Sequence, residues 1–427
     1  SRVVAVESVR APEENLFTEF YEGTRGREAS TTMVFVRLLA KLLRDERLGK
    51  LIVPIVPDEA RTFGMEWLFR QVGIYSHVGQ LYEPVDAATL LYYKEAKNGQ
   101  ILEEGITEAG AMSSFIAAGT AYATHGVNTI PFFIFYSMFG LQRVGDLVWA
   151  AGDSRCHGFM LGGTAGRTTL PGEGLQHQDG NSHLLAYPVP NLVAYDPAFA
   201  FELAVIIREG IRRMYEKQED VFYYLTLMNE NYAHPPMPEG EAIKEGILKG
   251  MYRFKAAEGG RSDLRAHLFG SGAILNEALK AQGLLAAEYG VAADVWSVTS
   301  YKELHREGNE VERWNMLHPA EKPRTPYIAE CVAGDDGVFV AATDYVKALP
   351  DSISRWLPGR LISLGPDGFA RSESRAALRD FFEVDYRFIT LATLVALSRK
   401  RKIKTEVVTQ AMRDLEIDPD KATPRLA

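Results

Sequence analysis

Residues 130–140 read Ile-Pro-Phe-Phe-Ile-Phe-Tyr-Ser-Met-Phe-Gly, and this stretch is the clearest indication of the fold. Residues 130–138 are almost continuously apolar or aromatic, which is typical of a strand buried on both faces. Gly140 follows and favours a loop at this point. The stretch therefore predicts a central strand of a parallel sheet.

Strand-like and helix-like segments alternate on both sides of this stretch. Before it, Ser30 or Thr31 is expected to cap a helix that leads to a short apolar strand at 51–56. The elements expected after it are strands at 159–162, 191–195 and 221–228 and an amphipathic helix over 198–214. This alternation predicts βαβ units, in which helices connect parallel strands.

A proline-rich segment at 235–238 interrupts the pattern and precedes a second α/β unit. Its expected elements are strands at 267–272, 293–299, 338–343 and 360–364 and helices over 273–289 and from Glu373 and Asp385. We therefore predict the α/β fold class, with two doubly wound domains in series. The expected limits are a linker or arm over 1–30, a first domain over 31–238 and a second domain over 239–427.

The composition argues against several classes of protein. A hydrophobic share of 46% and a charged share of 24% are typical of a globular protein, and a formal net charge of -9 argues against binding nucleic acid or an anionic membrane. No apolar run reaches the roughly 20 residues needed to span a bilayer. The two cysteines, Cys156 and Cys331, provide neither a disulfide framework nor a thiolate metal site, and they fit a cytoplasmic location.

The most unusual charged residue is Glu108, which is the only one between Glu104 and His125. Its neighbours are mostly small or apolar, so the carboxylate is expected to be buried, where it tends to keep a proton unless it is paired. Such a group suits a general acid or the hydrogen-bond partner of a heterocycle. From the composition alone a structural interpretation is favoured, in which Glu108 starts a helix that Thr107 caps and is stabilised by the helix dipole.

Other candidate residues lie where strands are expected to end. Tyr136 and Phe139 follow the central strand, and Asp58 and Glu59 follow the strand at 51–56. Ligands of open α/β sheets bind outside the carboxyl ends of the strands, so the aromatic rings are well placed to stack on a flat ring. The default alternative for an aromatic residue on a strand is the core.

A glycine-rich cluster at 172–183 contains two histidines and two carboxylates, including His177. This composition is typical either of a loop at a functional site or of a solvated turn. Its spacing matches no helical zinc motif, so we assign no metal ligand to the cluster.

Several long motifs resemble those of the homodimeric type of pyruvate dehydrogenase, a member of the transketolase superfamily. The resembling residues are 55–65 (Ile-Val-Pro-Asp-Glu-Ala-Arg-Thr-Phe-Gly-Met), 100–106 (Gln-Ile-Leu-Glu-Glu-Gly-Ile), 136–140 (Tyr-Ser-Met-Phe-Gly), 172–177 (Gly-Glu-Gly-Leu-Gln-His), 312–319 (Glu-Arg-Trp-Asn-Met-Leu-His-Pro) and 424–427 (Pro-Arg-Leu-Ala). The resemblance extends nearly from Ser30 to the end. It implies a thiamine pyrimidine-binding domain over 31–238 and a transketolase-like C-terminal domain over 239–427.

The resemblance also implies an activity and the residues that carry it. The family decarboxylates pyruvate with thiamine diphosphate and reductively acetylates the lipoyl group of a dihydrolipoyl acetyltransferase core. Glu108 matches the glutamate that hydrogen-bonds a ring nitrogen of the cofactor, and Phe139 matches the aromatic residue that stacks on its pyrimidine. Tyr136 and His177 match positions that contact the substrate, while Glu59 and Asp58 match the acidic strand end near the cofactor.

One motif of the family has no counterpart. The family binds the diphosphate and Mg²⁺ through Gly-Asp-Gly followed by a distant Asn, whereas Asp179-Gly180 and Asp336-Gly337 here lack the preceding glycine. We therefore expect the diphosphate-binding domain, which would hold Mg²⁺, to be absent, and this chain to be inactive without that half or a second subunit. The family implies a homodimer. The alternatives are another transketolase-superfamily enzyme, such as a different 2-oxo acid dehydrogenase, and a non-catalytic assembly half.

Overall fold

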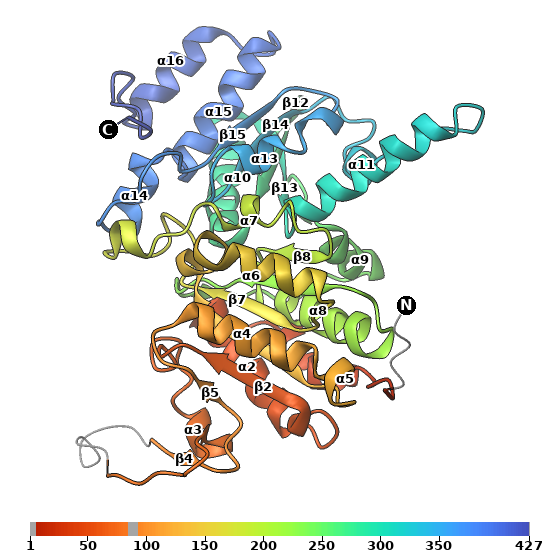
Figure 1. Ribbon diagram of the computed structural model, residues 1–427. Helices are drawn as coiled ribbons and strands as arrows, with labels where there is room; N and C mark the ends of the chain where they lie inside the picture. Colours follow the sequence, from red (N-terminus) through yellow and green to blue (C-terminus); the bar gives the residue numbers. More distant parts are fainter. Residues whose placement is uncertain (1–5, 84–92, 427) are drawn as a thin grey trace. The chain divides into compact units, whose positions relative to one another are not determined.

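The computed structural model describes residues 6–83 and 93–426 and confirms an α/β fold built from parallel sheets (Figure 1). The chain forms two compact units, each with its own sheet. Unit 1 consists of Ser1–Ala165, Leu185–Ala194 and Phe199–Met237, and unit 2 consists of Gly166–Leu184, Tyr195–Ala198 and Pro238–Ala427. The domain limits expected from the sequence stay a prediction.

Unit 1 is built on a six-stranded sheet in the order β5-β2-β6-β7-β9-β8. The pairs β5–β2, β2–β6, β6–β7 and β7–β9 are parallel, as the alternating pattern predicts. Unit 1 also contains two sheets of two strands each, β1-β10 and β3-β4. The strands of the unit are β1 (Glu28–Ala29), β2 (Ile52–Val56), β3 (Ile74–Tyr75), β4 (Glu95–Ala96), β5 (Leu102–Glu103), β6 (Ile130–Tyr136), β7 (Phe159–Gly163), β8 (Leu192–Tyr195, whose last residue belongs to unit 2), β9 (Phe222–Thr226) and β10 (Tyr232–Ala233). Its helices are η1 (Glu14–Leu16), α1 (Thr18–Tyr21), α2 (Thr31–Arg44), η2 (Gly49–Leu51), α3 (Leu68–Val72), α4 (Glu108–Gly119), α5 (Ala121–Thr124), η3 (Ser137–Phe139), α6 (Leu141–Asp153), α8 (Ala200–Ile211) and η5 (Arg212–Glu216).

The central strand β6 behaves as its sequence predicts. All of its residues up to Phe135 are buried, and Phe132 stacks on Phe159 of the neighbouring β7 with ring centroids 4.7 Å apart. Burial on both faces explains the continuous apolar run, because neither side of the strand meets water. Helix α4 packs against β6 and α6, while α2 packs against α8.

The residues before α2 pack on unit 1. Phe17 and Phe20 are buried, and β1 pairs with β10 in an antiparallel ladder. Ser30 caps α2 by accepting a hydrogen bond from the Met33 amide at 3.1 Å, as expected. The described part of the N-terminal arm is therefore packed within unit 1.

Unit 2 contains a five-stranded sheet in the order β11-β13-β12-β14-β15. The pairs β13–β12, β12–β14 and β14–β15 are parallel, but the edge strand β11 is antiparallel to β13 and was not predicted, because a half-exposed strand of four residues has little hydrophobic pattern. Its strands are β11 (Tyr252–Lys255), β12 (Arg261–Gly270), β13 (Val291–Ser297), β14 (Val338–Ala342) and β15 (Leu361–Leu364). Its helices are η4 (Gly174–Gln176), α7 (Ser182–Leu185, whose last residue belongs to unit 1), α9 (Glu241–Lys249), η6 (Gly272–Ile274), α10 (Leu275–Tyr289), α11 (Tyr301–Leu317), α12 (Tyr327–Cys331), α13 (Ala348–Asp351), η7 (Ser354–Trp356), α14 (Arg375–Phe381), α15 (Tyr386–Arg399) and α16 (Thr405–Asp414).

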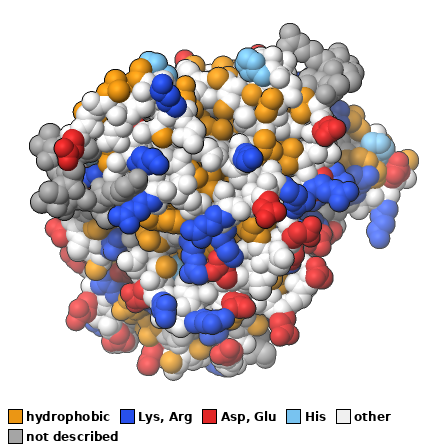
Figure 2. Space-filling view, turned by 90° about the horizontal axis from the view of Figure 1, so that it is seen from below, with side chains coloured by type: hydrophobic (Ala, Val, Ile, Leu, Met, Phe, Trp, Pro, Cys, Tyr) orange, Lys and Arg blue, Asp and Glu red, His pale blue; other side chains and the backbone are white. Residues whose placement is uncertain are grey.

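Within unit 2, α15 packs against α10, α16 and β14, whereas α11 extends away from the sheet (Figure 1). Figure 2 shows a face of the molecule on which positive and negative side chains are interspersed with hydrophobic ones, without a continuous basic stripe. None of the helices formed by residues 6–83 and 93–426 is long and apolar enough to cross a membrane.

Candidate active site

Three neighbouring strands of unit 1 place five of the predicted site residues at one edge of the sheet. Asp58 and Glu59 follow β2, Glu108 follows the adjacent β5 and begins α4, and Tyr136 and Phe139 follow β6 on the other side of β2. Because these strands are parallel, their carboxyl ends meet at the same edge, which is where ligands of such sheets bind.

Glu108 is buried at the start of α4, with 7% of its surface exposed. The Thr107 hydroxyl caps this helix by accepting a hydrogen bond from the Gly110 amide at 3.1 Å. The partial positive charge of the helix start favours a carboxylate at this position, as the structural interpretation predicts. Thr107 and Ala109 are nevertheless exposed, so Glu108 turns inward between two solvent-facing neighbours.

The one cation beside Glu108 in the described part of the chain is Arg143 of α6, with its Nη1 3.8 Å from Glu108 Oε2. That distance exceeds a hydrogen bond, and the Arg143 side chain is 57% exposed, so solvent screens the pair. The same guanidinium lies 4.0 Å above the Phe139 ring. Arg143 thus connects the two predicted cofactor-binding residues, and no local pattern in the sequence indicates it.

The aromatic residues at this edge form a connected row. The Tyr136 ring lies 5.6 Å from that of Phe63 and 5.8 Å from that of Phe139, measured between centroids. Tyr136 and Phe139 are half-buried, whereas Phe63 is buried against Gly163, where an added Cβ would come within 2.3 Å of the Phe63 ring. The row therefore offers two partly accessible rings on a rigid support.

We call Asp58, Glu59, Glu103 and Glu108 the edge carboxylates. Burial raises the pKa of Glu59, and the charges of Asp58 and Glu108 add to that effect. Burial also raises the pKa of Glu103 to about 7, with the Asp58 charge as the next cause. Asp58 and Glu103 line a cavity of about 580 Å³. Like charges held together in a partly buried place are characteristic of proton-handling sites.

Glu103 was not singled out from the sequence, although it lies within the quoted motif at 100–106. Its position as the last residue of β5, paired with Val56 of β2, could have indicated the same edge of the sheet. The signal was weak because β5 has only two residues.

His177 belongs to unit 2, in the stretch 166–184 that lies between β7 and β8 in the sequence. It follows the short helix η4, and its Nδ1 lies 2.9 Å from Glu173 Oε2. The imidazole is 19% exposed and the Glu173 carboxylate 45% exposed. The Glu173 carboxylate lies beside Nδ1 as a close polar contact and not as a hydrogen bond of good geometry.

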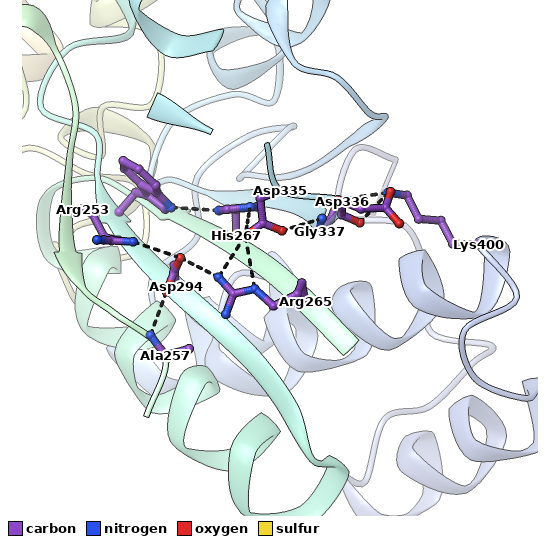
Figure 3. A network of polar contacts seen from close by, with 10 residues as sticks. Arg253, Ala257, Arg265, His267, Asp294, Asp335, Asp336, Gly337 and Lys400 are labelled. Atoms are coloured by element: carbon purple, nitrogen blue, oxygen red, sulfur yellow. Dashed lines mark hydrogen bonds and ion pairs between the residues drawn. The ribbon is translucent and has the colours of Figure 1, made fainter. Parts of the chain in front are cut away.

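One group of three potential metal ligands, His267, Asp294 and Asp335, occurs among residues 6–83 and 93–426 (Figure 3). Arg265 lies between the two carboxylates, with its Nη2 2.8 Å from Asp294 Oδ2 and 3.0 Å from Asp335 Oδ2. The remaining carboxylate oxygens accept hydrogen bonds from the amides of Ala257 and Gly337. A metal ion would have to displace a guanidinium that already bridges the two carboxylates.

The histidine of this group is also engaged. Trp296 Nε1 donates to His267 Nδ1 at 3.1 Å, so the neutral ring carries its proton on Nε2, 3.4 Å from Asp335 Oδ2. Burial lowers the pKa of His267, which favours this neutral form. We call Arg265, His267, Asp294 and Asp335 the Arg265 cluster and interpret it as a structural ion-pair network.

The parallel sheets of the two units give the chain a transketolase-like α/β fold. Its fold is similar to that of a transketolase from Leishmania mexicana, with a TM-score of 0.64 and 15% identity over 90% of this chain and 48% of that one.

Comparison with protein families is more specific. Residues 9–235 match the model of the pyruvate dehydrogenase E1 component middle domain, and residues 250–385 match that of the transketolase-like C-terminal domain. The chain therefore belongs to the pyruvate dehydrogenase E1 component family.

Curated relatives carry the same family name. The chain is 56% identical to the pyruvate dehydrogenase E1 component of Pseudomonas aeruginosa over 98% of its own length and 47% of that protein. It is 51% identical to the component of Escherichia coli strain K12 over 94% of its own length and 45% of that protein. The chain thus spans about half the length of the curated relatives that it matches.

Proposed function

We propose that this chain forms the pyrimidine-binding and C-terminal parts of a thiamine-diphosphate-dependent pyruvate dehydrogenase. In this proposal residues 31–238 are the pyrimidine-binding domain, residues 239–427 are the C-terminal domain and residues 1–30 are an arm. The substrates are pyruvate and the lipoyl domain of a dihydrolipoyl acetyltransferase. Identity above 50% to proteins named as the E1 component, across nearly the whole chain, supports the assignment.

The observation that carries the proposal is the environment of Glu108. It is a buried carboxylate at the carboxyl edge of a parallel sheet, and its nearest cation is solvent-screened at 3.8 Å. Burial of a carboxylate is costly unless a partner satisfies it, and a protonated ring nitrogen or a ring N–H would do so. The residues therefore fit a heterocycle held by Glu108 and stacked against Phe139.

Each residue then has a defined task. Bound thiamine diphosphate supplies a carbon nucleophile and an electron sink for the loss of carbon dioxide. Glu108 holds a proton at a ring nitrogen of the cofactor, and Phe139 fixes the plane of the ring by stacking. Tyr136 and His177 contact the substrate, while Glu59 and Asp58 keep the local potential negative and favour proton uptake.

The remaining components come from outside this chain. We propose that Mg²⁺ and the diphosphate are held mainly by an N-terminal half, supplied as part of a longer chain or as a separate one. The only group of potential metal ligands among the described residues is bridged by Arg265, which supports this division. A homodimer in the cytoplasm completes the proposal.

The test combines the chain with the N-terminal half in trans and measures carbon dioxide release from pyruvate with thiamine diphosphate and Mg²⁺. We expect release from the mixture and none from either half. Glu108→Gln should lower the rate by roughly 100-fold or more, because the amide cannot hold the ring proton as the carboxylate does. No release from a folded complex of the unmodified halves would contradict the proposal.

Glu104→Gln is the matched control, because it makes the same change four residues earlier. Glu104 accepts a hydrogen bond from the Ser114 hydroxyl at 2.6 Å and is only half-buried. We expect less than about a threefold change in rate for this variant. An equal loss in both variants would mean that Glu108 acts through the stability of α4 and not on the cofactor.

A further inference from the structure

The loop that carries His177 is held by residues from the far end of the sequence. Residues 166–184 belong to unit 2, where the Gly172 amide donates to the Glu373 carbonyl at 3.0 Å. Arg167 Nη1 donates to the carbonyls of Pro366 and Gly368 at 2.8 Å and 2.7 Å. The loop is therefore positioned by the C-terminal part of the chain.

Asp344 is the central anchor of this arrangement. It follows β14 and is fully buried, and its Oδ1 accepts hydrogen bonds from both the amide and the hydroxyl of Thr168 at 2.7 Å. Its Oδ2 accepts a hydrogen bond from the Thr169 hydroxyl at 2.5 Å. Three donors from two consecutive residues thus converge on one buried carboxylate, which is the condition under which a charge is tolerated in the interior.

The anchor extends from Thr169 toward His177. Arg375 Nε donates to the Thr169 carbonyl at 2.6 Å, which fixes the backbone next to Leu170. Gln178 Nε2 then donates to the Leu170 carbonyl at 2.6 Å, and Gln178 Oε1 accepts from the Arg371 amide at 3.1 Å. Since Thr169 is bonded to Leu170 and His177 to Gln178, these hydrogen bonds and the intervening peptide bonds connect Asp344 to the backbone of His177.

The site leaves Asp344 little freedom to move. Gly166 has a φ of 92°, and a Cβ added there would lie 2.3 Å from Asp344 Oδ2. The Thr169 hydroxyl that donates to Asp344 also accepts from Arg379 Nη2 at 3.2 Å. Burial raises the pKa of Asp344, while the charge of Arg379 opposes that shift. In Asp344→Asn the side-chain amide would present its N–H to the Thr169 hydroxyl, which already accepts a hydrogen bond from Arg379.

We propose that Asp344 is a positioning residue for His177, acting through Thr168, Thr169 and the loop closed by Gln178. The catalytic consequence rests on the proposed function, in which His177 contacts the substrate. The physical consequence, that the loop is held in one conformation, does not depend on the proposed function. Both consequences can be measured separately.

The first experiment uses the reconstituted enzyme and a double-mutant cycle. Asp344→Asn should lower the rate of carbon dioxide release by about 10-fold, because small displacements of a positioned group cost at least that much. In the His177→Ala background the same change should alter the rate by less than about twofold. Equal losses in both backgrounds would overturn the proposal.

The second experiment does not depend on activity. Hydrogen exchange measured on the whole chain should become at least about 10-fold faster at residues 170–178 in Asp344→Asn. Asp294→Asn is the matched control, because Asp294 is also a buried unit 2 carboxylate and its partners Ala257 and Arg265 lie outside the loop. Unchanged exchange in 170–178 would overturn the proposal even if the enzyme proved active.

A gentler pair of variants covers the case in which Asp344→Asn fails to fold. Thr169→Val removes the hydroxyl with little change of shape, whereas Thr169→Ser keeps it. Thr169→Val should show the same faster exchange and the same His177-dependent loss of rate as Asp344→Asn. Thr169→Ser should keep the exchange and the rate of the unmodified enzyme. If the unmodified enzyme releases no carbon dioxide, the proposed function fails while the exchange measurement still decides the role of Asp344.

Discussion

The edge carboxylates of unit 1 and the Arg265 cluster of unit 2 both bring acidic side chains together, but they differ in how the charge is balanced. In the Arg265 cluster a guanidinium lies within 3.0 Å of Asp294 and Asp335, and backbone amides occupy the remaining oxygens. At the edge of unit 1, Glu108 has a single screened cation at 3.8 Å, and the pKa of Glu103 rises to about 7.

The charges of the Arg265 cluster are therefore interpreted as part of the fold, whereas the edge carboxylates are candidates for a functional role. A compensated buried cluster contributes to the fold and resists change, because removing one partner leaves another charge buried without compensation. An uncompensated carboxylate stores unfavourable free energy that a ligand or a proton can release. The types of side chain alone, two carboxylates and an imidazole close together, would have favoured the Arg265 cluster as a metal site, whereas the contacts favour the edge of unit 1 as the candidate active site.

The largest effect on stability is expected in unit 2, when the Arg265 cluster loses its guanidinium. Arg265→Met should lower the free energy of unfolding by about 3–5 kcal/mol, because Asp294 and Asp335 lose their shared partner. Denaturant titration of the chain measures the effect. Arg253→Met is the control: Arg253 lies 3.7 Å from the same Asp294 but is 55% exposed, so less than about 1 kcal/mol is expected. Similar losses in both variants would contradict the structural interpretation of the cluster.

A smaller effect is expected from the raised pKa of Glu103. A carboxyl group whose pKa is higher in the folded state stabilises the fold below its unfolded pKa, near 4.5, and this contribution is lost as pH rises through about 7. Glu103→Gln should therefore stabilise the chain at pH 8, by about 1–2 kcal/mol after allowance for solvent screening, and have little effect at pH 4.

Unfolding measured at both pH values tests this prediction. Glu95→Gln is the matched control, because it makes the same change in a carboxylate that lines the same cavity. Stabilisation of Glu103→Gln that is equal at pH 4 and pH 8 would show that the charge of Glu103 is not its cause.

The smallest effect on stability is expected at Arg143. Arg143→Met should change the free energy of unfolding by less than about 0.5 kcal/mol, because an exposed ion pair at 3.8 Å contributes little. The loss of carbon dioxide release should stay below about 10-fold, well short of that expected for Glu108→Gln. A destabilisation as large as that of Arg265→Met would remove the distinction between the two regions.

The sequence predicted most strands of the two sheets, but not β5 or β11, and it placed four candidate site residues at the ends of strands that the structure contains. The helix that starts at Glu108 with Thr107 as its cap and the buried strand before Tyr136 are both present. Local pattern was sufficient there, because capping and burial depend on neighbouring residues. Arg143 and Arg265 were missed, since nothing near them in sequence indicates which carboxylate they meet.

By itself, the sequence determined the α/β fold class, the family resemblance and the identity of the candidate site residues, because strand burial, helix caps and long motifs are local properties of the chain. Only the tertiary structure decided which carboxylates are compensated and which elements hold His177. Those outcomes depend on contacts between residues as distant as Thr168 and Asp344, or Arg265 and Asp335. The cost of burying a charge is set by such partners, and no local pattern specifies them.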